Sequence, residues 1–209
     1  MLDSSVLIGF VAAALVVLLT PGPGVLYVVA RSVSQGQRAG LISVLGLSSG
    51  ALVHVAAAAL GLSAILLASA AAFTIVKLLG AGYLIYLGIR MLLARGPATG
   101  IDVPAPRSLS RMFVDGVFVS VLNPKIAVFF LAFLPQFVQP GAGPVARQVL
   151  CLGLIYVGLA LVTDSAYALL AGRFRHWMGG RVVQGRAPQY ATGAVYLGLG
   201  VSTAFAERP

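Results

Sequence analysis

Two proline-containing stretches, Thr20-Pro21-Gly22-Pro23-Gly24 and Asn123-Pro124-Lys125, interrupt apolar runs that are each long enough to cross a bilayer. Proline has no backbone N–H, and its ring clashes with the carbonyl group four residues earlier, so a helix interior kinks or opens there. In hydrocarbon, the backbone groups that the break frees must find a partner in the protein, in water or in a ligand. Two such breaks in corresponding parts of the two half-chains predict a substrate site near the middle of the membrane.

The composition is that of an integral membrane protein. Of the 209 residues, 59% are hydrophobic and only 9% are charged, and the mean hydropathy is +1.00. Soluble domains carry about 25% charged residues. The length accommodates about six helices of roughly 20 residues with short loops, so we predict a single membrane domain over residues 1–209.

Polar and proline-rich segments divide the apolar runs and predict an all-α fold of six transmembrane helices. The first and the fourth helix contain the two breaks, and polar residues 32–37 are expected to form the first loop. The longest polar stretch, about 95–111, is expected to link half-repeats of about 1–95 and 111–209. The predicted helices are 5–30, 40–68, 73–94, 112–137, 147–171 and 189–205.

The two halves of the chain also correspond in sequence. A shift of 103 residues places Thr20-Pro21 on Asn123-Pro124 and Phe10 on Phe113. Because each half has three helices, an odd number, the second half would enter the membrane upside down relative to the first. Inverted repeats of this kind recur among secondary transporters, so we expect two inverted three-helix repeats.

Positive charge is distributed unevenly along the chain, which has a formal net charge of +9. Most arginines flank the loops that follow the first, third and fifth predicted helices, whereas only Arg147 and Arg208 lie on the other side. Arginine-rich loops remain in the cytoplasm, next to anionic lipid. This pattern predicts that both termini lie outside, and it explains the basic charge without nucleic acid, which we do not expect as a partner.

A few polar side chains lie deep in the predicted spans. Asp164 lies about 9 Å inside its run, where a lone carboxylate is costly unless it is paired, hydrated or protonated. It would bind a cationic group or a coupling proton, or else cap broken backbone or pair with a structural cation. Lys125 would hold a substrate carboxylate or form an ion pair with Asp164. Asn123, the only asparagine in the chain, would form hydrogen bonds with the backbone groups freed by the break or with a substrate. Thr20 is its predicted counterpart in the first helix.

Glycines near the breaks indicate close contact between backbone and a ligand, and glycines in the second predicted helix indicate close contact with another helix. Gly22 and Gly24 let backbone approach a ligand, and a half-helix that begins after the break would point its positive end at a carboxylate. The alternative is a plain proline kink that only shapes packing. Gly46 and Gly50 predict a packed helix face. His54 follows them on the same face, as a packing residue or as part of a proton relay.

No motif predicts an enzyme, a cofactor or a metal site. The single cysteine, Cys151, excludes a disulfide carrier, and neither a glycine-rich phosphate motif nor a nucleophilic serine motif is visible. Two alternatives to an organic-solute transporter are a non-transporting membrane scaffold or lipid-binding protein, and a metal-ion exporter. The lack of clustered Asp, Glu, His or Cys argues against the metal-ion exporter.

Several motifs in order along the chain resemble one known family. They are Pro21-Gly22-Pro23, Gly80-Ala81-Gly82-Tyr83-Leu84-Ile85-Tyr86-Leu87-Gly88, and Asn123-Pro124-Lys125 followed by Phe129-Phe130 and Pro135-Gln136-Phe137. In this order and at this spacing they resemble the lysine exporter (LysE/RhtB-type) family of bacterial amino-acid exporters. The resemblance covers nearly the whole chain.

This resemblance implies a six-helix transporter of the bacterial inner membrane that exports amino acids or close derivatives in exchange for protons. It implies that residues 21–23 and 123–125 line the central pathway and that Asp164 is the acid of the fifth helix. Ser120 departs from the family, whose members often have an asparagine there, so Ser120 and His54 are accessory candidates only. A homodimer through the glycine-rich faces is an alternative that the sequence leaves open.

Overall fold

The computed structural model describes residues 3–68, 106–139 and 141–173, together with isolated positions between 75 and 93 and between 194 and 201. The predicted helices 73–94 and 189–205 and most of the 95–111 linker lie outside the described residues. Within the described residues every regular element is helical. The elements are α1 (Ser4–Leu19), α2 (Pro23–Gln35), α3 (Gln37–Ala68), α5 (Leu109–Val121), α6 (Pro124–Val128), a π-helical turn (Phe129–Phe133), a 3-10 turn (Leu134–Phe137) and α7 (Val145–Arg173).

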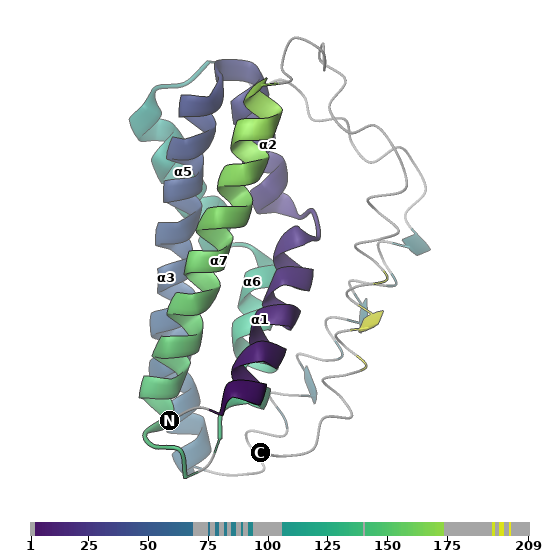
Figure 1. The fold of residues 1–209 in the computed structure, drawn as a ribbon, viewed down its shortest axis with the longest axis vertical. Helices are drawn as coiled ribbons and strands as arrows, with labels where there is room; N and C mark the ends of the chain where they lie inside the picture. Colours follow the sequence, from purple (N-terminus) through teal and green to yellow (C-terminus); the bar gives the residue numbers. More distant parts are fainter. Residues whose placement is uncertain are drawn as a thin grey trace.

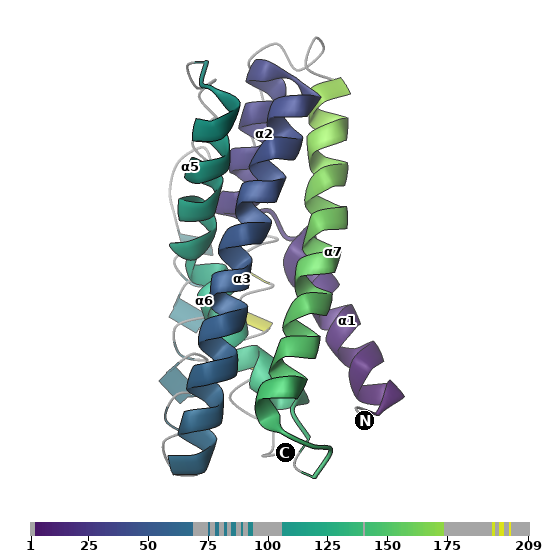
Figure 2. The ribbon, with the colours of Figure 1, turned by 90° about the vertical axis from the view of Figure 1, so that its left-hand side faces the viewer.

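The long helices α3 and α7 pack side by side and form the uninterrupted part of the bundle (Figure 1). Two broken rods accompany them, with α2 continuing from α1 and α5 continuing into α6 (Figure 2). The first rod bends by 53° and the second by 45°. By length and hydropathy α3 and α7 can each cross a membrane, and the described residues hold up to four spans if each bent rod is one span.

The first break spans residues 20–22, which confirms the predicted interruption but shortens it. A residue before proline disfavours helical backbone, and Thr20, which precedes Pro21, is extended at φ −76° and ψ 118°. Gly22 is extended as well and precedes α2. The sequence also assigned Pro23 and Gly24 to the break, but both residues belong to α2. Pro23 occupies the first position of this helix, where its missing N–H costs nothing.

The second break is centred on Asn123, whose side-chain Oδ1 accepts a hydrogen bond of 3.0 Å from the Lys125 N–H. This contact caps α6, and Pro124 occupies its first position. Asn123 therefore matches Gly22, which also precedes a proline that begins a helix. Thr20, the predicted counterpart of Asn123, also precedes a proline and has nearly the same backbone conformation, with φ −76° and ψ 118° against φ −77° and ψ 110°. It differs from Asn123 in following the last residue of α1 instead of capping the next helix.

The predicted loop over residues 32–37 is also wrong. Helix α2 continues to Gln35 and α3 begins at Gln37, so Gly36 alone separates them. Gly36 has a φ of 88°, a left-handed conformation that glycine adopts without the steric cost paid by other residues. A single glycine therefore replaces the loop that the polar composition predicted.

The glycines of α3 lie against α5, which confirms the predicted packed face. A Cβ atom on Gly46 would lie 2.2 Å from the backbone oxygen of Phe113, and one on Gly50 would lie 2.6 Å from that of Val117. Real side chains do not approach backbone this closely. The two helices therefore depend on bare glycine surfaces for their crossing, as small-residue faces in membranes do.

We expect the substitution Gly46→Ala to lower the melting temperature of the protein in detergent. The added methyl group forces α3 and α5 apart, and overpacking of this kind costs about 1–3 kcal/mol. The matched control is Gly61→Ala in the same helix, where a Cβ meets no atom of the described residues within 4 Å. Thermal unfolding followed by circular dichroism compares the two variants, and equal melting temperatures would contradict the close crossing.

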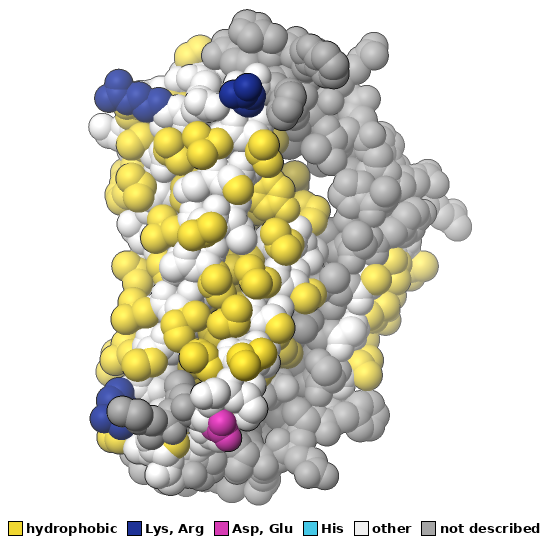
Figure 3. All heavy atoms as spheres, viewed as in Figure 1, with side chains coloured by type: hydrophobic (Ala, Val, Ile, Leu, Met, Phe, Trp, Pro, Cys, Tyr) yellow, Lys and Arg dark blue, Asp and Glu magenta, His cyan; other side chains and the backbone are white. Residues whose placement is uncertain are grey.

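The outer surface of the described helices is apolar. Figure 3 shows hydrophobic side chains over the middle of one face and Lys or Arg side chains at its two ends. Large side chains such as Ile8, Leu60 and Val162 are at least 70% exposed. An exposed apolar band between charged ends suits the hydrocarbon of a bilayer.

Candidate functional site

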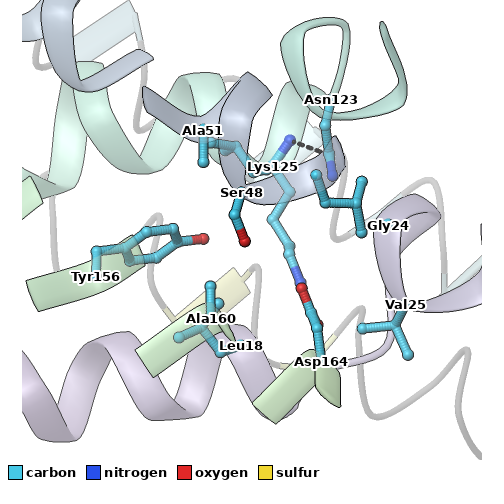
Figure 4. Close-up of a pocket in the computed structure, with 12 residues that line it drawn as sticks. Leu18, Gly24, Val25, Ser48, Ala51, Asn123, Lys125, Tyr156, Ala160 and Asp164 are labelled. Atoms are coloured by element: carbon cyan, nitrogen blue, oxygen red, sulfur yellow. Dashed lines mark hydrogen bonds between the residues drawn. The ribbon is translucent and has the colours of Figure 1, made fainter. Parts of the chain in front are cut away.

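The two breaks meet at a common cavity of about 30 Å³ (Figure 4). It lies between the end of α1, the start of α2, the start of α6, and the middle of α3 and α7. The polar side chains that line it are Ser48, Asn123, Lys125, Tyr156 and Asp164. Most of the remaining wall is apolar, and Gly24 brings the first turn of α2 to its edge.

The ammonium group of Lys125 reaches across the cavity to the end of α1. Its Nζ donates hydrogen bonds of 2.9 Å to the Val17 carbonyl and 2.8 Å to the Thr20 carbonyl. In an unbroken helix the Val17 carbonyl would accept from residue 21, but Pro21 has no N–H to give. Lys125, whose residue is only 6% exposed, supplies that donor and lies at the negative end of the α1 dipole.

The other two helix-breaking prolines leave the same kind of gap. The Leu19 carbonyl would accept from Pro23 and instead accepts a 2.9 Å hydrogen bond from the Tyr167 hydroxyl of α7. The Ser120 carbonyl would accept from Pro124 and instead accepts a 3.0 Å hydrogen bond from the Asn123 N–H and one of 3.1 Å from His54 Nε2 of α3.

Each of these three carbonyls therefore has a side-chain donor from another helix. His54 also stacks on Phe130 with ring centroids 6.2 Å apart. Its observed contacts are those of a hydrogen-bonded packing residue beside the second break, and neither His54 nor Ser120 lines the cavity.

The N-terminus of α2 presents positive backbone dipoles to the cavity. Gly22 makes no side-chain capping bond to the first turn, and Gly24 and Val25 both line the cavity. A Cβ on Gly22 would lie 3.3 Å from Lys125 Nζ, and one on Gly24 would lie 3.9 Å from Asn123 Nδ2. Amide donors and an ammonium group converge here, which suits an anion such as a carboxylate.

The carboxylate of Asp164 projects from α7 into the same cavity (Figure 4). The residue is 8% exposed. Among the described residues, no hydrogen bond and no ion pair within 4.0 Å is recorded for this carboxylate, although it faces Lys125 and attracts it electrostatically. The direct Asp164–Lys125 ion pair, one of the two predicted roles for this lysine, is therefore not formed in this structure. A buried carboxylate of this kind is poised for a proton or a cationic group.

The sequence did not predict two of the polar lining residues, Ser48 and Tyr156. Ser48 lies between Gly46 and Gly50, in a small-residue stretch that predicts only a packed helix face. Tyr156 lies eight residues before Asp164, a spacing that places both on one face of α7, and this spacing was the available signal. Because small and aromatic residues are common in membrane helices, neither pattern identifies a cavity by itself.

Asp115 joins α2 to α5 away from the cavity. Its carboxylate accepts from Arg107, lies 3.2 Å from Arg111 Nε and 4.0 Å from the buried Arg31. Gln35 and Arg107 add two hydrogen bonds of 2.8 Å between their neighbouring segments. This cluster fixes the end of the bundle on which the predicted cytoplasmic loops lie.

Comparison with known proteins confirms the resemblance found in the sequence. The family model of the LysE type translocator matches residues 15–206. A homoserine/homoserine lactone efflux protein of Salmonella typhimurium is 34% identical over 189 residues, which cover 90% of this chain and 91% of the relative. A threonine efflux protein of Escherichia coli K12 is 28% identical over 193 residues, with the same coverage of both chains.

An uncharacterized membrane protein of Vibrio cholerae is 30% identical over 212 residues, which cover 99% of this chain and 100% of the relative. No solved structure gives a significant match. The relatives whose names state an activity are efflux proteins and not enzymes. The family match begins near the end of α1 and includes both breaks and all of α3 and α7, and the chain therefore belongs to the LysE type translocator family.

Proposed function

We propose that this protein exports amino acids or close derivatives across the bacterial inner membrane in exchange for protons. The observation that carries the proposal is the cavity between the two broken helices, where groups that bind an anion and a group that binds a cation face the same small space. An amino acid is a zwitterion and presents both charges on neighbouring atoms. The relatives named for homoserine, homoserine lactone and threonine efflux support the substrate class.

The substrate carboxylate would bind at the start of α2. Backbone amides of its first turn and the Asn123 side chain offer neutral donors, and the Lys125 ammonium lies 3.3 Å from the position of a Cβ on Gly22. The two breaks expose these groups to the cavity, and they are shaped by Thr20, Pro21, Gly22, Pro23 and Pro124. These residues act by exposing backbone groups to the substrate, which explains why glycine and proline surround the site.

Asp164 would bind the substrate amino group in one step and the coupling proton in the other. A protonated carboxyl group has no charge with which to hold an ammonium group, so the two ligands exclude each other. Protonation from the outside releases the substrate outward, and proton release to the inside restores the charged site. This alternation is the requirement for an exchanger.

The cavity must open for transport to occur. A volume of about 30 Å³ holds about two water molecules, which is too little for an amino acid. Movement of the half-helices about the breaks would open the site to one side at a time, as expected if the six predicted spans form two inverted repeats. The Asp115 cluster lies where it would hold the predicted cytoplasmic side closed.

Counterflow in proteoliposomes tests the proposed function. Vesicles loaded with unlabelled homoserine or threonine should accumulate the same labelled amino acid from outside, and an imposed proton gradient should drive net movement. A panel of amino acids in the same assay ranks the substrates. Vesicles that contain folded protein but accumulate no labelled amino acid would instead favour the non-transporting scaffold or lipid-binding alternative.

A further inference from the structure

The hydroxyl group of Ser48 lies in the cavity wall without a partner. Ser48 is 8% exposed, and among the described residues its Oγ has no hydrogen-bond partner. Figure 4 shows it pointing into the space between Tyr156 and Asp164. Buried hydroxyl groups are nearly always hydrogen-bonded, because an unpaired one has lost its water without compensation.

The Ser32 and Ser120 hydroxyl groups also lack a partner among the described residues, but only Ser48 lines the cavity. Two other serines of α3 show the ordinary arrangement. The Ser43 hydroxyl donates to the Ala39 carbonyl at 3.0 Å, and the Ser49 hydroxyl donates to the Leu45 carbonyl at 2.9 Å. Both use the carbonyl four residues earlier, as a helix serine ordinarily does. Ser48 does not, and its oxygen remains available to whatever enters the cavity.

We propose that Ser48 determines specificity by hydrogen-bonding an oxygen on the side chain of the exported amino acid. This inference rests on the proposed function, which places the substrate carboxylate near Gly24 and Asn123 and its amino group near Asp164. Figure 4 shows Ser48 and Tyr156 on the side of the cavity opposite Gly24 and Asn123. The substrate side chain would therefore extend toward the Ser48 hydroxyl.

The remaining surroundings of Ser48 define the class of side chain. Leu18, Ala51 and Ala160 contribute apolar wall, and the charged groups of the cavity are already assigned to the backbone end of the substrate. A charged substrate side chain would have no partner there. A short, neutral side chain with a hydroxyl or ester oxygen at Cβ or Cγ fits this wall, whereas its deoxy analogue leaves Ser48 unpaired.

The test compares homoserine with 2-aminobutyrate, which differs only by lacking the hydroxyl group. In proteoliposome counterflow, the unmodified protein should prefer homoserine by about tenfold, the value expected for one neutral hydrogen bond and its unpaired alternative. Ser48→Ala should reduce the preference to about twofold or less by slowing homoserine only. If the alanine variant does not fold, Ser48→Cys replaces it, because cysteine keeps most of the serine volume but forms only weak hydrogen bonds. This variant should also lower the preference for homoserine to about twofold or less.

The matched control is Ser49→Ala, which removes a hydroxyl group from the next residue of the same helix outside the cavity and should keep the tenfold preference. A Ser48→Ala protein that slows both substrates equally, or keeps the full preference, would overturn the specificity role while leaving the proposed function intact. If the unmodified protein moves neither substrate, the proposed function fails first and the inference fails with it.

Discussion

Replacement of Asp164 with asparagine will abolish proton-driven export and leave the protein folded. Asparagine has nearly the same shape as aspartate but neither binds nor releases a proton in the physiological range. Asp164 is the one carboxylate among the residues that line the described cavity. Two effects on stability oppose each other: the cost of holding the Asp164 charge out of water disappears, while Lys125 loses the negative charge that it faces. We therefore expect a melting temperature close to that of the unmodified protein.

The measurement is substrate export from proteoliposomes with and without an imposed proton gradient. The Asp164→Asn protein should show the same rate in both conditions, at the level of vesicles without protein. Asp3→Asn is the control, because it also removes a carboxylate but at the exposed N-cap of α1 outside the cavity, where asparagine caps about as well as aspartate, and it should remain responsive to the gradient. A response to the gradient in Asp164→Asn equal to that of the unmodified protein would exclude the proposed role.

The breaks were predictable because they follow from local chemistry. A proline acts on the backbone within four residues of itself, so Pro21 and Pro124 indicated the interruptions and the apolar runs around them indicated the helices. The donors that replace the missing N–H groups were not predictable. Lys125, Tyr167 and His54 lie 66 to 148 residues away in sequence from the carbonyls they bind, and only the packed fold brings them there.

The errors in the sequence-based description have physical causes as well. Residues 32–37 are polar enough to predict a loop, yet helical hydrogen bonds continue through them on both sides of Gly36. Ser48 is chemically the same as Ser43 and Ser49, and only the facing of each side chain distinguishes a cavity residue from a packing residue. Composition fixes neither a helix boundary nor the direction of one hydroxyl group.

Replacement of Lys125 with methionine will destabilise the protein and slow export. Methionine keeps the length and apolar stem of lysine but leaves the Thr20 carbonyl without its 2.8 Å donor. A buried acceptor that loses its partner costs about 1–3 kcal/mol, and Asp164 at the same time loses the positive charge that it faces. Export should fall as well, because the variant lacks the ammonium group beside the proposed carboxylate position at Gly22. Loss of one hydrogen bond to a charged group, about 1.5–3 kcal/mol, corresponds to a decrease of about tenfold or more.

The double variant Lys125→Met with Asp164→Asn distinguishes charge coupling from simple loss of a hydrogen bond. If the two charges stabilise each other across the cavity, Asp164→Asn should restore part of the stability that Lys125→Met removes, because the double variant leaves no uncompensated charge. Unfolding in detergent of all four proteins gives the coupling free energy. Strictly additive effects would show that Lys125 acts on the carbonyls of α1 alone, and that Asp164 holds its charge in the cavity independently of the lysine.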